Sequence, residues 1–575
     1  MTSSARRKRA PDGPPRWRFA AVVGVLALVA GAVLLRALDL QVLNSEFLRS
    51  AAEERHLRTV SMPAQRGIIT DRTGEPLAVS SPVPSAWAEP EALLEDPGAV
   101  RAVAETLERP AGELRDYLEA RAGREFVYLQ RHLPPDRAEE IRRLDADGVH
   151  LQRELRRFYP AGEVAAQLVG FTDIDGEGLA GVERTFDDAL AGRDGAKRVL
   201  RDSHGRTIGD AELLREPEPG QEITLSIDRR VQYLAYRELK RAVKGHDADS
   251  GSAVILDATT GELVALANQP SFNPHRQGEA EAAQRRNRAA YMAREPGSVI
   301  KPFTVAAALR SGAVDRHAEF DTAPGTMRVG GHTVRDLLDY GDLDVAGVLE
   351  KSSNVGTVKM ALETPPRALW STLEDFGLGA RTRSGLASES AGQFLASPPR
   401  GDVQRATLAY GYGVTATPLQ IARAYAALAR DGVMREVSLT PVDEPPEGRQ
   451  VLDPGLAAEL RGMLEGVVQP GGTGTRADVS GYRVAGKTGT VLKSGPGGYE
   501  DEDYVATFAG FAPASEPQLV MVVTINQPAG DRYYGGQVAA PVFERVMTGA
   551  LRLLNVPPDD LPGSGRRVAA GEGEE

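Results

Sequence analysis

An uninterrupted apolar run near the N-terminus restricts the fold of this chain more than any other feature. Residues 19–35 include no charged side chain, a length at the short end of the ~17–25 residues that a helix needs to cross a bilayer. Arg36 can extend its side chain to the membrane interface, which lengthens the span to Leu38. Basic residues precede the run, so the positive-inside rule places the N-terminus in the cytoplasm. We therefore expect a cytoplasmic tail over 1–18, an anchor in the inner (cytoplasmic) membrane over 19–38, and every later residue outside the cytoplasm.

Two other interpretations of the apolar run are a cleaved signal peptide and a buried helix. The residues after Leu35 contain no small-x-small cleavage site, which favours an uncleaved anchor. No second run of this length occurs in the sequence, so we expect a single pass through the membrane.

The composition excludes several classes of function. The 575 residues carry a net charge of −12, so the chain lacks the excess of Lys and Arg with which nucleic-acid binders neutralise phosphates. Cys is absent, which excludes disulfides, thiol nucleophiles and thiolate metal sites. The region between the anchor and residue 224 has no His, Asp and Glu group with metal-ligand spacing. The sequence therefore predicts no nucleic-acid partner, no metal and no cofactor.

The chain after the anchor divides into regions of different character. Residues 39–224 are rich in Arg and Glu and predict short amphipathic helices, as in an extracytoplasmic spacer or docking module. Residues 225–554 have strand-like segments at both ends and helical segments between them, which predicts an α+β domain with an antiparallel sheet built from distant segments. The expected helices are 110–121, 135–144, 305–309 and 419–428, and the expected strand pairs are 252–257 with 262–267 and 504–511 with 518–525. Residues 555–575 are rich in Pro, Gly and acidic residues and predict a disordered tail.

A serine and a lysine three residues apart form the first candidate catalytic pair. A Pro-Gly turn precedes Ser298 and Lys301, which share one face of the helix that follows, so the amine can reach the hydroxyl. A serine hydroxyl is a weak nucleophile until a base removes its proton, and lysine can act as that base once its pKa falls. Pro302 cannot donate a hydrogen bond to the carbonyl of Ser298, so the first turn should be irregular. A lone Ser-x-x-Lys is more often a solvent-facing pair.

A second polar segment follows at Lys351-Ser-Ser-Asn354. The hydroxyl of Ser352 and the amide of Asn354 lie two residues apart, so in a tight turn both can face one cleft. There the hydroxyl can pass a proton to a leaving amine, and the amide can bind a substrate carbonyl or the catalytic lysine. The same pattern is also typical of a helix cap or an ordinary turn.

The third polar segment is Gly-Lys-Thr-Gly-Thr over residues 486–490. Gly489 allows a ligand to approach the backbone closely. Lys487 and the hydroxyls of Thr488 and Thr490 are suited to binding a carboxylate, although an ordinary strand end is the simpler interpretation. Three such segments in this order within about 200 residues indicate one shared site.

These three motifs resemble the S-x-x-K, S-D-N and K-T-G signature of penicillin-binding proteins and class A β-lactamases. The chain resembles a class B penicillin-binding protein, and more narrowly the septal, cell-division type (penicillin-binding protein 3). Ser353 stands where this signature has Asp, a departure that leaves the roles of Ser352 and Asn354 intact. The resemblance also covers residues 66–80, 158–163, 168–172, 181–183, 269–274, 410–413 and 533–536.

The resemblance implies a peptidoglycan D,D-transpeptidase with a membrane anchor, an elongated pedestal domain and a transpeptidase domain whose central antiparallel sheet is flanked by helices. Ser298 would attack the D-Ala–D-Ala bond of a stem peptide and release the terminal D-Ala, and an amine of a neighbouring stem would then attack the acyl-enzyme. Lys301 would be the base, Ser352 and Asn354 would complete the proton network, and Lys487 would tune it. β-Lactams would acylate the same serine.

The resemblance also implies groups that hold the substrate. Thr488 and Thr490 would bind the substrate carboxylate, with Gly489 between them, and the amides of Ser298 and Thr490 would form the oxyanion hole. Three tyrosines resemble the aromatic wall of the cleft, although they can equally be core or surface aromatics: Tyr504, Tyr533 and Tyr534.

Several related functions remain as alternatives at this stage. They are an elongation-type transpeptidase, a D,D-carboxypeptidase or β-lactamase on the same fold, and a sensor or scaffold with a vestigial serine domain. No Glu-x-x-Leu-Asn segment supplies the carboxylate that a class A β-lactamase uses for deacylation, and the complete motif set argues against a vestigial site. The resemblance further implies a separate SEDS-type glycosyltransferase and other cell-division proteins as partners, which would dock on the anchor and pedestal.

Overall fold

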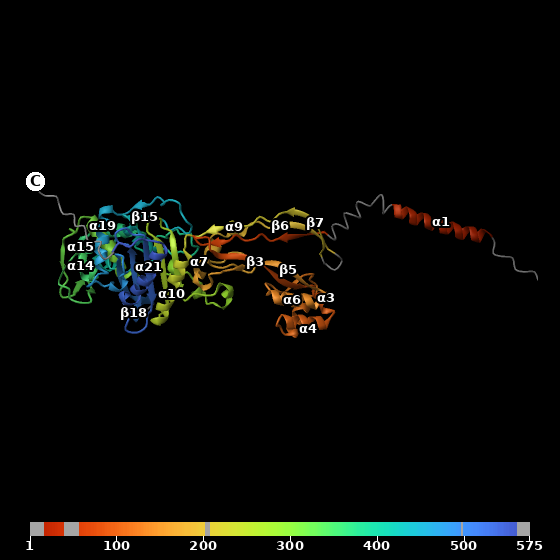
Figure 1. Cartoon of the computed structure of the whole chain (residues 1–575), viewed down its shortest axis with the longest axis horizontal. Coiled ribbons are helices and arrows are strands. Elements are labelled where there is room, and N and C mark those ends of the chain that lie inside the picture. The colour runs from red at the N-terminus through yellow and green to blue at the C-terminus, as the bar shows by residue number, and fades with distance from the viewer. Residues whose placement is uncertain (1–15, 39–56, 202–206, 496–497, 561–575) are drawn as a thin grey trace, which may run out of the picture.

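The computed structural model describes residues 16–38, 57–201, 207–495 and 498–560. Its long axis leads from helix α1 past an extended middle region, the pedestal, to a larger domain that holds the C-terminal helices (Figure 1). The expected α+β class, with one N-terminal apolar helix and two domains, is confirmed.

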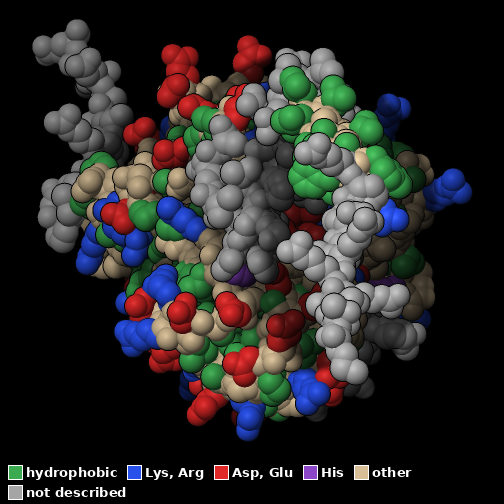
Figure 2. Space-filling view, turned by 90° about the vertical axis from the view of Figure 1, so that its right-hand side faces the viewer, with side chains coloured by type: hydrophobic (Ala, Val, Ile, Leu, Met, Phe, Trp, Pro, Cys, Tyr) green, Lys and Arg blue, Asp and Glu red, His purple; other side chains and the backbone are tan. Residues whose placement is uncertain are grey.

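Helix α1 (Arg16–Leu38) forms at the apolar run. It is the one helix in the described ranges that is long and apolar enough to cross a membrane. At ~1.5 Å per residue, its 23 residues extend about 34 Å, more than the ~30 Å hydrocarbon core of a bilayer. Its large side chains are exposed, among them Phe19 at 77% and Leu35 at 71%, which does not fit a buried helix. Seen from the α1 end, hydrophobic side chains gather on this helix, while charges of both signs are spread over much of the surface behind it (Figure 2).

The pedestal is built from two sheets and a group of short helices. The strands are β1 Leu57–Met62, β2 Ile69–Thr70, β3 Pro76–Ala88, β4 Val127–Gln130, β5 Val149–Phe158, β6 Gly195–Arg201, β7 Thr207–Arg215 and β8 Ile223–Thr224. They pair as β1-β6-β7 and as β4-β3-β2-β8, with β5 also along β3. The helices are α3 Pro90–Leu94, α4 Pro97–Thr106, α5 Ala111–Glu119, α6 Pro135–Leu144, η2 Gly162–Val164, α7 Ala166–Val169, α8 Gly181–Thr185 and α9 Asp187–Ala191. Helices α5 and α6 match the two predicted amphipathic helices.

A buried ionic cluster joins two of the pedestal segments that carry the family resemblance to strand β5. The Glu183 side chain has no exposed surface, and its two carboxylate oxygens each accept a hydrogen bond of 2.7 Å, one from Arg66 Nε and one from Arg157 Nε. Burial of a carboxylate is costly unless it is paired in this way. The cluster therefore fixes residues far apart in sequence at the base of the pedestal.

The segment 66–80 also ties the pedestal to the larger domain. Asp71 Oδ2 accepts a hydrogen bond of 2.9 Å from the backbone of Arg229, at the start of helix α10, and Arg72 forms an ion pair of 2.5 Å with Glu262. Because Glu262 lies in the turn between the first two strands of the larger domain, this contact reaches the central sheet itself.

The larger domain contains a five-stranded antiparallel sheet. Its strands are β9 Ser250–Asp257, β10 Leu263–Gln269, β17 Ala485–Gly495, β18 Gly498–Ala512 and β19 Leu519–Asn526. The order β10-β9-β19-β18-β17 places the first and last strand-forming segments side by side, as predicted, and leaves β17 at one edge. Ala253 and Ile255 of β9 pack in a core with helices α10 and α21, and Val254 and Leu256 pack in the core on the other face with α13 and α18.

The remaining elements surround this sheet. The helices are α10 Arg229–Gly245, α11 Ala282–Arg285, α12 Arg288–Tyr291, α13 Lys301–Arg310, α14 Val345–Glu350, α15 Asn354–Glu363, α16 Pro366–Asp375, α17 Asp402–Ala409, α18 Pro418–Ala429, α19 Pro454–Gly466, α20 Gly535–Val538 and α21 Ala540–Leu553, with the 3-10 turns η3 Pro274–Glu279, η4 Gly297–Ile300 and η5 Thr475–Ala477. Three small ribbons complete the domain: β11 Glu319–Asp321 with β14 Asp342–Asp344, β12 Thr326–Val329 with β13 His332–Arg335, and β15 Val433–Met434 with β16 Arg449–Gln450.

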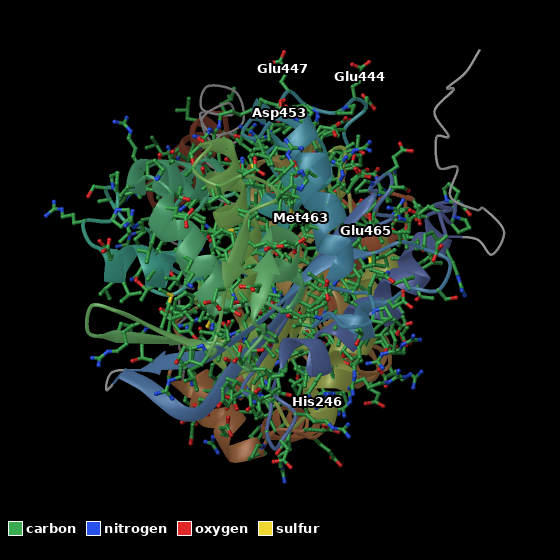
Figure 3. All side chains as sticks on the ribbon, turned by 90° about the vertical axis from the view of Figure 1, so that its left-hand side faces the viewer. His246, Glu444, Glu447, Asp453, Met463 and Glu465 are labelled. Atoms are coloured by element: carbon green, nitrogen blue, oxygen red, sulfur yellow. The ribbon has the colours of Figure 1, made fainter. Side chains whose placement is uncertain are left out.

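The view onto the end of this domain shows α19 with Asp453 at its start and Glu465 near its end, while the β12–β13 and β17–β18 hairpins project together from the opposite side (Figure 3). Two of the residues in the predicted tail, Val556 and Asp559, are bonded to the domain. Val556 O accepts a hydrogen bond from Tyr482, and Asp559 accepts one from the backbone of Arg483, so these residues pack on the domain. Residues 561–575 of that prediction lie outside the described part of the chain.

Candidate active site

The serine of the first motif lies in a 3-10 turn that leads into α13. Ser298 belongs to η4, and α13 begins at Lys301, whose backbone amide donates to the carbonyl of Ser298. Pro302 has no amide hydrogen with which to continue the α-helical pattern there, so the irregular first turn that the sequence predicts is confirmed. Gly297 has a φ of +58°, and a Cβ at this position would lie 2.2 Å from Val491 Cγ2. Glycine is therefore required immediately before the serine.

Two contacts from distant segments hold this turn. The backbone amide of Gly297 donates to the carbonyl of Gly411 over 3.2 Å, and the fully buried Tyr425 donates its hydroxyl hydrogen to the carbonyl of Val299 over 2.8 Å. Both bonds end on the backbone on either side of Ser298. They position the half-buried serine without occupying its hydroxyl.

Lys301 is completely buried and bonded to the second motif. Its Nζ donates to Asn354 Oδ1 over 2.7 Å and to the carbonyl of Ser352 over 2.6 Å, and it lies 3.3 Å from Ser352 Oγ. Burial lowers the pKa of Lys301 to about 7, against an opposing effect of the Asp336 carboxylate. About half of a lysine with this pKa is neutral at pH 7, and the neutral amine is the form that a general base requires.

The second motif forms the junction between α14 and α15. Ser352 has a φ of +59°, and Ser353 caps α15 by accepting a hydrogen bond of 2.9 Å from the backbone of Gly356. Asn354 Nδ2 donates to the carbonyl of Arg335 over 2.8 Å, which turns Oδ1 toward Lys301. Of the two roles considered for this amide, the geometry supports contact with the lysine.

The third motif lies within the edge strand β17 and not ahead of it. A Cβ on Gly489 would lie 3.1 Å from the carbonyl oxygen of Pro296, so the absence of a side chain lets β17 pass close to η4. Lys487 is fully buried, and burial together with the nearby charge of Lys301 lowers the pKa of Lys487 well below its usual value. A buried amine next to Lys301 fits the tuning role that the resemblance implies for Lys487.

The threonines and tyrosines of the sequence prediction lie along the same edge. Thr488 Oγ1 is 2.8 Å from Thr473 Oγ1, and Thr490 Oγ1 accepts a hydrogen bond of 3.0 Å from the backbone of Gly535. The ring of Tyr533 stacks on Tyr504 with centroids 4.0 Å apart, and the ring of Tyr534 lies 4.5 Å from that of Tyr533. The three tyrosines thus form one partly exposed cluster rather than part of the core.

Three residues of the site escaped the sequence interpretation. In the sequence, Gly411 belongs to a segment that resembles the family and Tyr425 to a predicted helix, while no motif marks Asp336. Each acts through a backbone or loop contact with a segment far away in sequence, so no local spacing could reveal it.

Comparison with known proteins identifies the family. A family model described as the penicillin binding protein transpeptidase domain matches residues 251–548, and one described as the penicillin-binding protein dimerisation domain matches residues 61–225. Over 551 residues the chain is 42% identical to the peptidoglycan D,D-transpeptidase FtsI of Escherichia coli K12, with 95% of this chain and 93% of the relative covered. The chain is a class B penicillin-binding protein.

Further relatives of this class B penicillin-binding protein include the probable peptidoglycan D,D-transpeptidase PenA of Neisseria meningitidis, 40% identical over 545 residues, with 94% of this chain and 93% of that protein covered. A solved structure of penicillin-binding protein 3 from Mycobacterium tuberculosis in complex with aztreonam is similar, with a TM-score of 0.66, 30% identity, and coverage of 87% of this chain and 98% of that one. The family assignment made from the motifs is therefore confirmed.

Proposed function

We propose that Ser298 is the nucleophile with which this septal peptidoglycan D,D-transpeptidase crosslinks stem peptides. Ser298 Oγ attacks the carbonyl of the D-Ala–D-Ala bond and its proton passes to Lys301, which forms the acyl-enzyme. The terminal D-Ala leaves after it takes up a proton through Ser352. The amine of a neighbouring stem peptide then attacks the acyl group and gives up a proton to the site. The bond between the acyl carbon and Ser298 Oγ breaks, and Ser298 regains its proton.

The observation that carries this proposal is the state of Lys301. Its amine is completely buried, has a pKa of about 7 and lies one helical turn after Ser298, where Ser352 and Asn354 hold it. An amine in this state serves as a base at neutral pH, whereas an exposed lysine would be protonated. We further assign Lys487 to the proton network and Thr488, Gly489 and Thr490 to the substrate carboxylate and oxyanion hole, with Tyr504, Tyr533 and Tyr534 beside them.

Covalent labelling tests the assignment of Ser298. Full-length protein in detergent is incubated with fluorescent penicillin, denatured and separated on a gel. The wild type should retain the label, Ser298→Ala should not, and Ser311→Ala should label normally, because Ser311 lies at the far end of α13. Retention of the label by Ser298→Ala would rule out this nucleophile.

The protein is anchored in the inner membrane, and we propose that its N-terminus faces the cytoplasm. The support is the basic cluster ahead of α1. A protease added to spheroplasts should digest the domain that carries Ser298 and spare an N-terminal tag. Digestion of the tag alone would contradict the proposed orientation and place the N-terminus outside the cytoplasm.

We propose residues 39–224 as the pedestal domain and residues 225–554 as the transpeptidase domain. We also propose that a SEDS-type glycosyltransferase and other division proteins dock on α1 and the pedestal. The support is the family relation together with the pedestal that separates α1 from the catalytic domain (Figure 1). Co-purification of such a polymerase should fail when α1 is replaced by an unrelated membrane helix; unchanged co-purification would remove α1 from the interface.

A further inference from the structure

The carboxylate of Asp336 lies directly behind the second motif, although that motif contains no acidic residue. Asp336 follows β13, and its own backbone amide is held by the carbonyl of Gly325 over 2.8 Å. Its Oδ2 accepts a hydrogen bond of 2.5 Å from Ser353 Oγ, and its Oδ1 accepts one of 3.0 Å from the backbone of Val355 and another from the backbone of Asn354. Three donors from one short segment therefore converge on a single carboxylate.

This convergence occurs where the backbone needs external support. Ser352 has a left-handed φ of +59°, which is unfavourable for a residue with a side chain and persists only where the surroundings enforce it. Asp336 binds the two amides that follow Ser353, and its neighbour Arg335 accepts a hydrogen bond from the side chain of Asn354. The end of β13 thus fixes both the backbone and the side chain that contact Lys301.

Ser353 links this carboxylate to helix α15. Its hydroxyl donates to Asp336 and accepts from the backbone of Gly356 at 2.9 Å, so one side chain both caps the helix and contacts the acid. An acid at position 353 itself would bring a second negative charge against Asp336. The Ser-Ser-Asn form of the motif in this chain is therefore matched to a carboxylate supplied from another strand.

We propose that Asp336 is a positioning residue of the acylation reaction, which holds Ser352 and Asn354 in the geometry that binds the Lys301 amine. The proposal rests on the function proposed above. Asp336 has a second, electrostatic effect, because the charged groups that face Lys301 are the carboxylate of Asp336 and the amine of Lys487. The carboxylate raises the pKa of Lys301 and so opposes the larger lowering by burial.

The two effects predict a result that a merely structural residue would not give. In Asp336→Asn the side chain keeps its shape, but the charge is lost and only one of its two terminal atoms can accept hydrogen bonds, so either the bond from Ser353 or those from the backbone of Asn354 and Val355 are lost. Acylation of the full-length protein by fluorescent penicillin should slow by about 10- to 100-fold at pH 7.5, as expected when a catalytic group moves by a fraction of an ångström. The acidic limb of the pH–rate profile should also move to lower pH, because the pKa of Lys301 falls without the nearby negative charge.

Two further variants make the test decisive. Asp336→Glu keeps the charge and should restore the midpoint of the profile toward that of the wild type, even if the rate stays low. Asp339→Asn removes a charge from the same loop, where the exposed Asp339 accepts a hydrogen bond of 3.0 Å from the nearby Gly341 backbone, and it should leave both the rate and the midpoint of the profile unchanged. Thermal unfolding of each variant confirms that the compared proteins are folded.

Each outcome separates this inference from the proposed function. A wild-type rate for Asp336→Asn, or a slower rate with an unmoved midpoint that Asp336→Glu does not alter, would overturn the positioning role while leaving Ser298 as the nucleophile. A wild type that is not labelled at all, or a label that survives Ser298→Ala, would instead overturn the proposed function. A slower acylation rate of Asp336→Asn, together with a shifted midpoint of its pH–rate profile, supports both the positioning role of Asp336 and the proposed function.

Discussion

The pH dependence of acylation tests the central property of the site, the neutral amine of Lys301. Burial lowers the pKa of this group from 10.5 to about 7. At pH 7.4 an amine with that pKa is about 70% neutral, whereas a lysine with its ordinary pKa is about 0.08% neutral. Burial therefore increases the amount of reactive base by roughly 900-fold at this pH.

The same titration fixes the shape of the pH–rate profile. Protonated Lys301 cannot accept the proton of Ser298, so the acylation rate should follow the neutral fraction and rise with pH. Between pH 6 and pH 8 a group with a pKa of about 7 gains roughly tenfold in neutral fraction, and between pH 8 and pH 9 it gains only about a tenth more. An unshifted lysine would instead give about tenfold for every pH unit across this range.

The measurement is the second-order rate of labelling by fluorescent penicillin from pH 5.5 to pH 9.5, followed on denaturing gels. Thermal unfolding at each pH excludes loss of folded protein as the cause of a slow rate. A profile that is flat from pH 6 to pH 8, or that still rises tenfold per unit beyond pH 8, would refute the assignment of Lys301 as a neutral, buried base.

Three other changes probe separate parts of the molecule. Lys301→Arg puts a permanent positive charge in place of the titratable amine, so labelling should fall by on the order of 1,000-fold, while Lys359→Arg should label normally; near-normal labelling of Lys301→Arg would reject Lys301 as the base. Gly297→Ala should slow labelling at least about tenfold, because its Cβ would meet a β17 side chain, whereas Gly312→Ala, at a similar φ of +67° in open space, should not. Glu183→Gln removes the shared carboxylate of the pedestal cluster and should lower the free energy of urea unfolding by about 3–5 kcal/mol; a loss below about 1 kcal/mol would show that the cluster is not stabilising.

Much of the fold followed from local patterns. The hairpin at 252–267 and the strand pair at 504–525 were predicted because apolar segments flank recognisable turns, and these segments form four neighbouring strands of the observed sheet, β10-β9-β19-β18. The predicted helices likewise match α5, α6, α13 and α18 within a few residues. The sequence predicts the third motif ahead of a strand, but the motif lies inside β17. The prediction was wrong because the small and polar residues of the motif lack the apolar pattern of a strand, and η4 covers β17 there.

The site was predicted less completely than the fold. The spacing of Ser298 and Lys301 indicated a shared helical turn, yet the described contacts of the Lys301 amine are with Ser352 and Asn354. The sequence did not predict a role for Asp336, because an acidic residue in a loop carries no pattern that distinguishes it from any solvated aspartate. Its role is indicated by the three hydrogen-bond donors that meet at its carboxylate in the structure.

The amino-acid sequence by itself determined the membrane helix, because a long uncharged run has few alternatives to a bilayer, and it determined the order of the three catalytic motifs. It also determined the irregular turn after the serine, since Pro302 lacks an amide hydrogen there. The need for glycine at position 297 was decided by tertiary structure, because Val491 of β17 leaves no room for a Cβ. Tertiary structure alone decided the pKa of Lys301 and the burial of Lys487, because desolvation depends on how completely β17 and α15 enclose them. The convergence on Asp336 was decided in the same way, since a carboxylate gains its partners only when the end of β13 meets the start of α15.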